Sequence, residues 1–456
     1  MSRWVAWTMA GLLLSGCHRH VKPEPSPPPL AAQTEPTSTV AVPALEGQIG
    51  MARPATAQER AVIDELVRAA EAVRQLRLRR PVMIEIEDGE AIAESLRSQI
   101  EEADIERARA IYGTLGLLDA EDDLHAMFAG VLGEQVIGYY DPETGRLVIR
   151  EDVMNGLTGA HGSEQTQEAR LVLVHEIVHA LQDQRLGLGE SYQKERTSDA
   201  DNAFRAVVEG DATLAMLAHA LRQQGIPLSA ATEGIQQLGN HLDLNGLVQG
   251  EKLDDAPTIV RVTLIAPYLR GLQFIAAVQG RGGWPAVNNA HRRSPVSSEQ
   301  ILHPDKYFAR EPSEAIVVQD SPQVLAAGFK RVAEDTLGEL ELGVYLGQST
   351  PSGAADQAAA GWAGDQLIIY ARNRQTAAVW WTSWDTDRDA EEAFHAARSV
   401  SPSAPNAMVE RKGRSVLIVR GLPAKLHRQV RNEFSKFARA VEGQPAPPEI
   451  PPSPVY

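Results

Sequence analysis

The stretch LVLVHEIVHAL at residues 171–181 determines how the rest of the chain is interpreted. Its apolar residues recur at intervals of three and four, which predicts an amphipathic helix with one buried face. We expect this helix to extend from Gln167 to Leu186 and to be capped by Gly187. Polar chemistry on a core helix is costly unless it serves a purpose, so the polar residues inside the stretch are candidates for function.

Two of these residues, His175 and His179, are four positions apart. On a helix they differ by about 40° around the axis, so both imidazoles can bind one metal ion. Glu176 lies on the adjoining flank, where its carboxylate can reach a water molecule without being a ligand. This HExxH arrangement is typical of zinc sites. The alternative is a surface helix with two solvated histidines, which the apolar neighbours make less favourable.

A zinc site of this type needs a third protein ligand and one open position. Glu209, which follows His179 by 30 residues, is the best candidate, because it lies among apolar residues of a second predicted helix, Asp199–Gln223. Asp211 is close enough to accept a hydrogen bond from the other N–H of a histidine ligand, although a solvated acid is an equal alternative. We therefore expect one zinc ion.

Four stretches carry a resemblance to a known family. The histidine motif with a later glutamate resembles the gluzincin clan of metallopeptidases, and more closely a group of bacterial zincin-like lipoproteins. The resemblance covers residues 125–310 well and the C-terminal region more loosely. Its matching stretches are HEIVHALQDQ at 175–184, VEGDA at 208–212, GYYDPETG at 138–145, and Pro267-Tyr268 through GGW at 282–284 to HPDKY at 303–307.

The resemblance implies hydrolysis of a peptide bond in a protein or peptide substrate. Zinc would be held by His175, His179 and Glu209, and Glu176 would take a proton from water and pass it to the leaving amine. Two other readings remain open. The chain could be a zinc-fold binding or assembly lipoprotein without activity, or a metal-dependent hydrolase of a cell-wall bond.

The same resemblance implies an edge strand at residues 135–140 that binds substrate by β-augmentation. The strand and the run at 146–149 surround a turn with proline and glycine, which predicts a β-hairpin. Its substrate-binding residues would be Gly138, Tyr139 and Tyr140. A donor to the transition-state oxyanion is also needed; the candidates are Tyr268, His291 and His303, each of which packing or capping explains as well.

The N-terminus has the features of an export signal. Arg3 precedes an apolar run that ends in Leu-Ser-Gly-Cys at residues 14–17. This tetrad resembles the lipobox of bacterial lipoproteins, which implies a signal peptide at 1–16 and a lipid on Cys17; the alternative is an ordinary signal peptide with an incidental cysteine. His18 follows in place of aspartate, so we expect anchoring in the cell envelope at the outer membrane, on the periplasmic or surface face.

Composition and sequence patterns divide the rest of the chain into a tether, two domains and a tail. Pro-rich segments predict a disordered tether at 17–57 and a tail at 443–456. Between them we expect a mainly α-helical zincin-like domain at 58–311 and an α+β accessory domain with a mostly antiparallel sheet at 325–442, a multidomain α+β fold. In the accessory domain, strands are expected at 340–346, 367–371, 377–382 and 415–420, and helices at 388–399 and 426–440.

Two further features limit the partners. The net charge of -16 argues against nucleic acid, because phosphate binding requires a basic surface. Trp380, Trp381 and Trp384 could form a carbohydrate-binding face, but alternating burial in a strand explains the first two more simply. The oligomeric state is left open.

Overall fold

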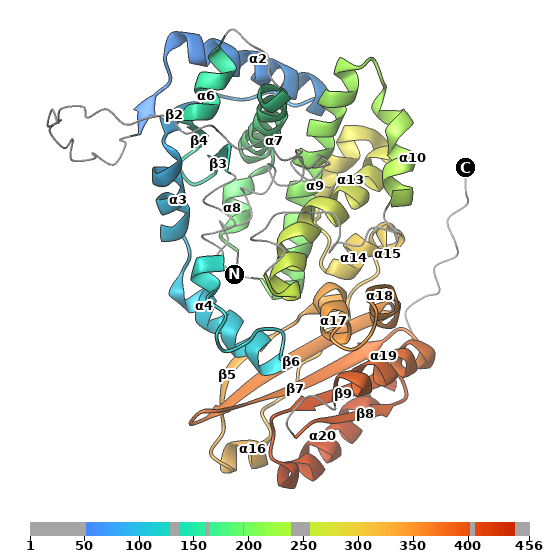
Figure 1. Cartoon of the computed structure of the whole chain (residues 1–456). Coiled ribbons are helices and arrows are strands. Elements are labelled where there is room, and N and C mark those ends of the chain that lie inside the picture. Colours follow the sequence, from blue (N-terminus) through green and yellow to red (C-terminus); the bar gives the residue numbers. More distant parts are fainter. Residues whose placement is uncertain are drawn as a thin grey trace, which may run out of the picture.

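The computed structural model describes residues 52–127, 136–159, 164–194, 196–238, 256–401 and 406–442. They form a multidomain α+β fold, in which a mostly helical N-terminal half lies above an antiparallel sheet with its own helices (Figure 1). The predicted signal peptide, Cys17, most of the tether and the tail lie outside the described residues.

The N-terminal half contains a four-stranded sheet in the order β1-β2-β4-β3. The predicted hairpin is confirmed as β3 (Gly138–Asp141) and β4 (Arg146–Arg150), and β3 is an edge strand. The hairpin is not isolated, because β2 (Met83–Glu87) pairs with β4 in parallel. Strand β1 (Arg53–Pro54) pairs with β2 and falls inside the predicted tether at 17–57, so the folded part begins earlier than predicted.

Shorter helices complete this half. Helix α2 (Ala57–Arg74) begins with a capping box at Thr56 and ends at Gln75, whose φ of 58° is left-handed. Helix α3 (Gly89–Ser98) is separated from the next helix by a break at residues 99–101. The remaining short helices are α4 (Glu102–Ala108), the π-helical turn Arg109–Gly113, α6 (Glu151–Thr158), α8 (Leu188–Tyr192), α10 (Leu228–Leu238), α14 (Ser298–Leu302) and α15 (Pro304–Ala309).

Three long helices build the core of this half. Helix α7 (Glu164–Leu186) ends at Gly187, whose φ of 73° is the left-handed conformation expected of a C-terminal cap. Helix α9 (Ser198–Gln223) packs between α7 and α13 (Thr258–Arg292). Helix α13 is kinked at Gly282 and is apolar enough to cross a membrane, but 72% of its most apolar window is buried in the protein. It is therefore the central core helix.

Helices α9 and α13 cross with almost no space between their backbones. A Cβ atom added at Gly210 would lie 2.2 Å from the carbonyl carbon of Gly271. A Cβ atom added at Gly271 would lie 2.1 Å from the carbonyl oxygen of Ala206. Only glycine permits this approach, which fixes the position of Glu209, the residue before Gly210.

We expect Gly210→Ala to lower the free energy of unfolding by about 1–3 kcal/mol, because the methyl group forces the two backbones apart. Chemical denaturation of the variant measures the loss. Gly156→Ala in α6 is the matched control, since nothing lies within 4 Å of a Cβ atom at that position. Equal stability of the Gly210 variant and wild type would contradict the proposed close packing.

The C-terminal half contains the second sheet, in the order β5-β6-β7-β9-β8 with every pair antiparallel, as predicted. Its strands are β5 (Lys330–Asp335), β6 (Trp362–Arg372), β7 (Gln375–Trp384), β8 (Met408–Lys412) and β9 (Ser415–Arg420). One face packs against α17 (Gly338–Leu346), α18 (Ser352–Ala359) and α19 (Asp387–Val400), and the other against α16 (Pro322–Ala326) and α20 (Ala424–Glu442).

The strand predicted at 340–346 is wrong, because these residues form helix α17. The helix begins at a tertiary cap: the carboxylate of Asp365 accepts hydrogen bonds from the backbone N–H groups of Leu337 and Gly338, at 3.1 and 2.8 Å. A short apolar run buried on all sides has no period that separates a strand from a helix. The contact that decides the structure comes from strand β6, distant in sequence.

Alternating burial of the tryptophans is confirmed. Trp380 packs with α17 on one face of the sheet, whereas Trp381 packs with α20 on the other. The face that holds Trp380 continues into the helical half, because one apolar cluster joins it to Leu264 and Tyr268 of α13. The two halves thus share a hydrophobic core.

Candidate metal centre

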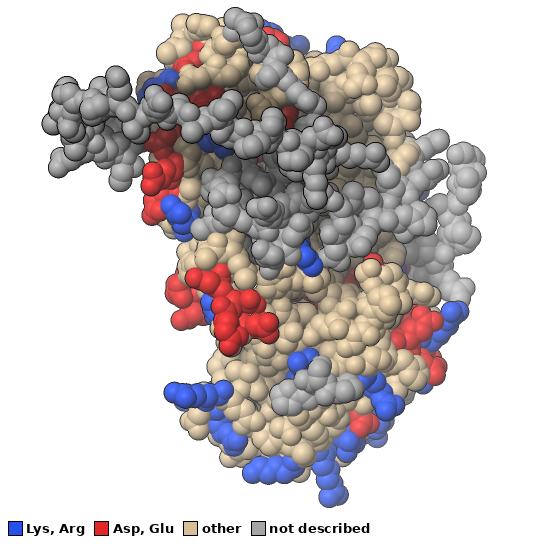
Figure 2. Space-filling view, in the orientation of Figure 1, with Lys and Arg blue, Asp and Glu red and all other residues tan. Residues whose placement is uncertain are grey.

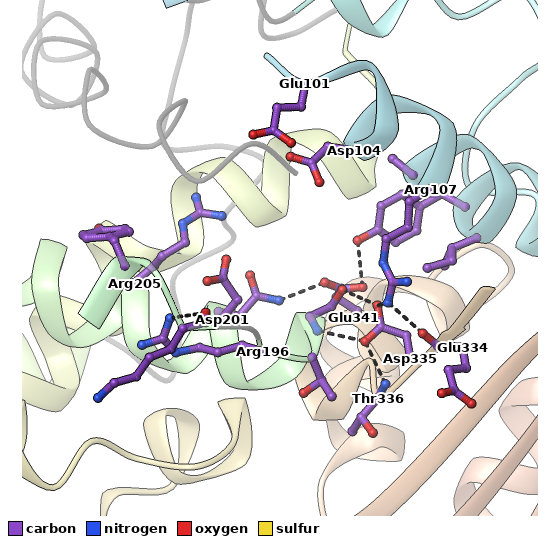
Figure 3. Close-up of a pocket in the computed structure, with 18 of the residues that line it drawn as sticks. Glu101, Asp104, Arg107, Arg196, Asp201, Arg205, Glu334, Asp335, Thr336 and Glu341 are labelled. Atoms are coloured by element: carbon purple, nitrogen blue, oxygen red, sulfur yellow. Dashed lines mark hydrogen bonds and ion pairs between the residues drawn. The ribbon is translucent and has the colours of Figure 1, made fainter. Parts of the chain in front are cut away.

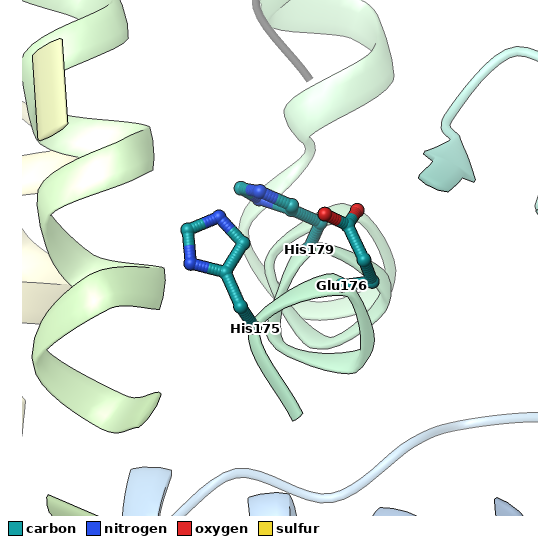
Figure 4. A group of neighbouring side chains, drawn as sticks. All are labelled: His175, Glu176 and His179. Atoms are coloured by element: carbon teal, nitrogen blue, oxygen red, sulfur yellow. The ribbon is translucent and has the colours of Figure 1, made fainter. Parts of the chain in front are cut away.

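Four predicted residues meet between α7 and α9. His175, Glu176, His179 and Glu209 all have an exposed fraction of 0%. The Nε2 atoms of His175 and His179 lie 3.1 and 3.5 Å from Oε2 of Glu209. Figure 4 shows both imidazoles on one side of α7 and Glu176 on the adjoining flank, as the helical spacing predicted. The structure brings together all four residues of the predicted centre.

The two distances to Glu209 suit neighbouring ligands of one tetrahedral ion, and the ligand atoms of His175, Glu176 and His179 also lie within 4.8 Å of one another. Bonds of about 2.0–2.1 Å from zinc to nitrogen or oxygen separate neighbouring ligand atoms by roughly 3.3 Å, close to both observed spacings. Two imidazoles and one carboxylate are also a usual catalytic donor set for zinc. Burial lowers the pKa of His175, which favours the neutral imidazole that a metal requires.

A glutamine missed by the sequence analysis orients His179. The amide nitrogen of Gln182 donates to the carbonyl of Val208 and to Oδ2 of Asp211, both at 3.0 Å. The amide oxygen of Gln182 must then accept from Nδ1 of His179, at 2.9 Å. With the proton on Nδ1, the lone pair of Nε2 faces Glu209. The only sign of this role in the sequence is that Gln182 follows His179 by three residues, close to one turn of the same helix.

Asp211 is more remote from the ligands than predicted. It reaches His179 through Gln182 and forms a fully buried ion pair with Arg74 of α2, at 2.6 Å. His291 also binds Asp211, at 2.8 Å, so this oxyanion candidate belongs to the supporting network. Burial raises the pKa of Asp211, but the opposing effect of Arg74 and His291 is larger. The pKa of Asp211 is therefore well below its usual range. Asp211 is thus an ionised anchor for the ligand helix.

We expect Gln182→Leu to weaken zinc binding by about 10–100-fold, because His179 loses the acceptor that fixes its tautomer and ring orientation. Competition with a chromophoric chelator measures the affinity. Gln167→Leu, at an exposed position of the same helix, is the control. Unchanged affinity in the Gln182 variant would show that this amide does not orient a ligand.

Glu176 faces the edge strand. The backbone N–H of Tyr140 in β3 donates to its Oε2 atom at 3.1 Å, while Oε1 has no hydrogen-bond partner among the described residues. Burial, and then the charge of Glu209, raise the pKa of Glu176 well above its usual value. One carboxylate oxygen is therefore fixed and the other is available to a substrate or water.

The remaining residues of β3 are tightly packed. A Cβ atom at Gly138 would lie 2.6 Å from the carbonyl oxygen of Val148, so glycine is required there. Tyr139 contacts Ser95 through its hydroxyl, and the Tyr140 hydroxyl donates to Asp183 at 2.7 Å. The substrate-binding role of this strand remains a prediction.

The two other candidate donors to the oxyanion, Tyr268 and His303, lie at different sites in the structure. The ring of Tyr268 stacks on His175 with 6.0 Å between centroids, so it belongs to the centre. His303 instead pairs with Glu339 at 2.8 Å and lines a cavity between the two halves. Tyr192 was not predicted, yet it packs on Val208, and burial and the charge of Glu209 raise its pKa.

A cavity of about 960 Å³ lies between α4, α8 and α9 on one side and β5 and α17 on the other (Figure 3). Its lining includes Tyr192 and, one helical turn before Glu209, Arg205. Glu101 and Asp104 of α4 form another part of the wall, and Figure 2 shows acidic side chains gathered over α3 and α4. None of His175, Glu176, His179 and Glu209 lines the cavity, whose lining residue nearest to Glu209 along α9 is Arg205.

A second group of carboxylates does not form a metal site. Glu299, Glu311 and Asp385 lie close enough to hold an ion. The ammonium group of Lys306 already binds all three, at 2.6, 2.9 and 2.5 Å. This cluster joins α14 and α15 to the end of β7.

The fold and centre define a multidomain α+β protein with a buried His-Glu-His-Glu cluster in its helical half. Comparison with known families matches residues 323–431 to a domain of unknown function (DUF8575). The match covers the second sheet and its helices, and it leaves the helical half outside. No curated protein and no solved structure matches the chain.

Proposed function

We propose that this chain is a zinc-dependent peptidase of the gluzincin type, held at the bacterial cell envelope by a lipid on Cys17. One observation carries the proposal: the Nε2 atoms of His175 and His179 converge on Oε2 of Glu209 at the spacing of zinc ligands. The resemblance of the surrounding stretches to zincin-like lipoproteins supports the same assignment.

In this proposal, different residues of the chain activate the water molecule, hold the base and bind the substrate. When bound, zinc makes a water molecule more acidic and polarises a peptide carbonyl. Glu176 accepts the proton of the water and transfers it to the leaving nitrogen. The N–H of Tyr140 holds Oε2 of Glu176, which leaves Oε1 for this transfer. The outer edge of β3 would pair with the substrate as a further strand, beside the Tyr140 N–H that holds Glu176.

The burial of the centre sets a requirement on this function. Because all four side chains have no exposed surface, a substrate reaches Glu176 only after the surrounding structure opens. Tyr192 lines the cavity described above and packs on Val208, next to Glu209, so it is one of the side chains that such an opening would move.

The test is the zinc content and hydrolytic activity of the purified full chain, with casein and muropeptides as substrates. We expect one zinc ion per chain, cleavage of casein, and loss of cleavage after chelation that is restored by zinc. Absence of bound zinc would contradict the proposal. Cleavage of muropeptides alone would assign the centre to a cell-wall bond.

The same burial favours a second candidate, a zinc centre that stabilises the fold of a binding or assembly lipoprotein. Structural zinc sites have four protein ligands, whereas catalytic sites have three and keep one open position; Glu176 lies close enough to the histidines to be the fourth. This reading predicts bound zinc, a large loss of thermal stability on chelation, and no hydrolysis of either substrate. The experiment above separates the two candidates.

A further inference from the structure

Helix α20 packs an apolar face on the second sheet and turns a basic face outward. Leu426, Val430 and Phe434 are buried in the same apolar cluster as residues of β6, β7 and β9. The exposed positions of the helix include five cations: Lys425, Arg428, Arg431, Lys436 and Arg439. At about 100° per residue, all of these except Arg431 lie within about 80° of one another around the helix axis. The five cations are the basic face of α20.

Acidic side chains neutralise little of this basic face. Glu433, the acid of α20 whose side chain the structure describes, is half-buried and accepts a hydrogen bond from Ser321 at 2.8 Å. Arg431 pairs with Glu410 of β8 at 2.7 Å. No ion pair with a described residue is formed by the other three cations outside the last turn, Lys425, Arg428 and Lys436.

The end of β8 extends the basic face. The ammonium group of Lys412 donates a hydrogen bond to the hydroxyl of Ser435 in α20, so it lies beside the helix. Figure 2 shows lysine and arginine side chains along the lower edge of the molecule, the end that α20 forms in Figure 1, whereas acidic side chains gather over α3 and α4. The whole chain has a net charge of -16, so the basic face reverses the sign of the charge locally.

We propose that the basic face of α20 binds the anionic headgroups of a phospholipid bilayer. A flat, negatively charged surface can meet all the cations of one helix face at once, and each Lys or Arg near such a surface binds favourably. The apolar face of α20 is already packed on the sheet, so the helix would lie on the headgroups without inserting. The choice of a membrane as the partner rests on the proposed function, which places a lipid on Cys17.

The N-terminal segment is long enough for this contact. About 35 residues separate Cys17 from Ala52, the first described residue, and such a chain spans at most about 120 Å when extended. A compact protein of this length is about 55–60 Å across. The segment enters the fold at β1, next to β2 and distant from α20 in Figure 1. With α20 on the bilayer, the helical half and its metal centre would point away from the membrane.

Co-sedimentation with vesicles tests the proposal on the chain from His18 onward, which lacks the lipid but contains every described residue. Vesicles of phosphatidylcholine with about one third phosphatidylglycerol are compared with vesicles of phosphatidylcholine alone. We expect binding to the anionic vesicles only, and loss of this binding at high salt, because salt screens exposed charges. The measurement requires neither zinc nor hydrolysis, so its failure can be told from failure of the proposed peptidase activity.

A triple variant locates the surface. Lys425→Gln, Arg428→Gln and Lys436→Gln together should weaken partitioning into the anionic vesicles by about 100-fold, since each cation contributes about fivefold. The control changes the net charge equally at the other end of the protein and should bind as wild type; it combines Arg68→Gln, Arg77→Gln and Arg79→Gln. All six side chains are exposed, so both variants should fold, which circular dichroism checks.

Equal binding to the two kinds of vesicle overturns the proposal, and so does equal affinity of the two triple variants for the anionic vesicles. Binding to heparin without binding to anionic vesicles also overturns it, because the basic face would then recognise a soluble polyanion.

Discussion

Replacing Glu176 with glutamine is expected to lower peptide hydrolysis by about 10²–10⁴-fold, the usual contribution of a positioned acid–base group, while bound zinc stays at one ion per chain. The amide of glutamine has nearly the shape of the carboxyl group, and its oxygen can still accept from the N–H of Tyr140. It cannot take a proton from water. The chemical step is therefore lost without disturbing His175, His179 or Glu209.

Zinc content and casein cleavage are measured on the same preparation of wild type and variant. Glu168→Gln, two turns earlier on α7, is the matched control and should retain both. Hydrolysis that persists in the Glu176 variant would remove Glu176 as the base. Loss of zinc together with activity would instead indicate that Glu176 binds the metal.

Much of the centre could be predicted because its residues belong to local patterns. The spacing of His175 and His179 on one helix depends only on helical geometry. Glu209 could be found because a carboxylate among apolar residues needs a cation. Arg74 gave no such signal, since nothing in its own helix indicates that Asp211, 137 positions away, is its partner.

In the fold, too, elements with a local sequence pattern were predicted, and elements that depend on distant contacts were not. Strands with alternating or wholly apolar faces, such as β6 and β7, were predicted, whereas the edge strands β5 and β8 were missed. Their exposed positions carry charged residues such as Lys330, Arg331 and Lys412, so they lack an apolar pattern. Helix α17 could not be predicted because its first turn is held by Asp365, a contact made only in the folded protein.

Replacing Glu209 with glutamine is expected to weaken zinc binding by more than the roughly 10–100-fold that loss of an outer hydrogen-bond partner costs. The two histidines alone would leave the ion with two protein ligands, one fewer than a catalytic zinc site requires. Burial raises the pKa of Glu209, but His179 and His175 lower it to about 2, so the wild-type ligand is a carboxylate. An uncharged amide binds zinc far less well.

Affinity is measured by chelator competition and, independently, by the shift in melting temperature when zinc is added. A ligand that binds only the folded state stabilises it by RT ln(1 + L/Kd), where L is the free zinc concentration. Glu341→Gln is the matched control: Glu341 is another buried glutamate, 1% exposed, that binds Asn202 and Tyr112 outside the centre. It should leave the zinc affinity unchanged.

The two glutamate variants together decide which carboxylate is the third ligand. Glu176 also lies close enough to both histidines to bind the same ion. If Glu209→Gln binds zinc as wild type while Glu176→Gln does not, the ligand assignment is reversed and no base remains for hydrolysis. If Glu209→Gln alone loses zinc, Glu176 is left beside the ion with Oε1 unpaired in the described part of the chain, the position that proton transfer requires.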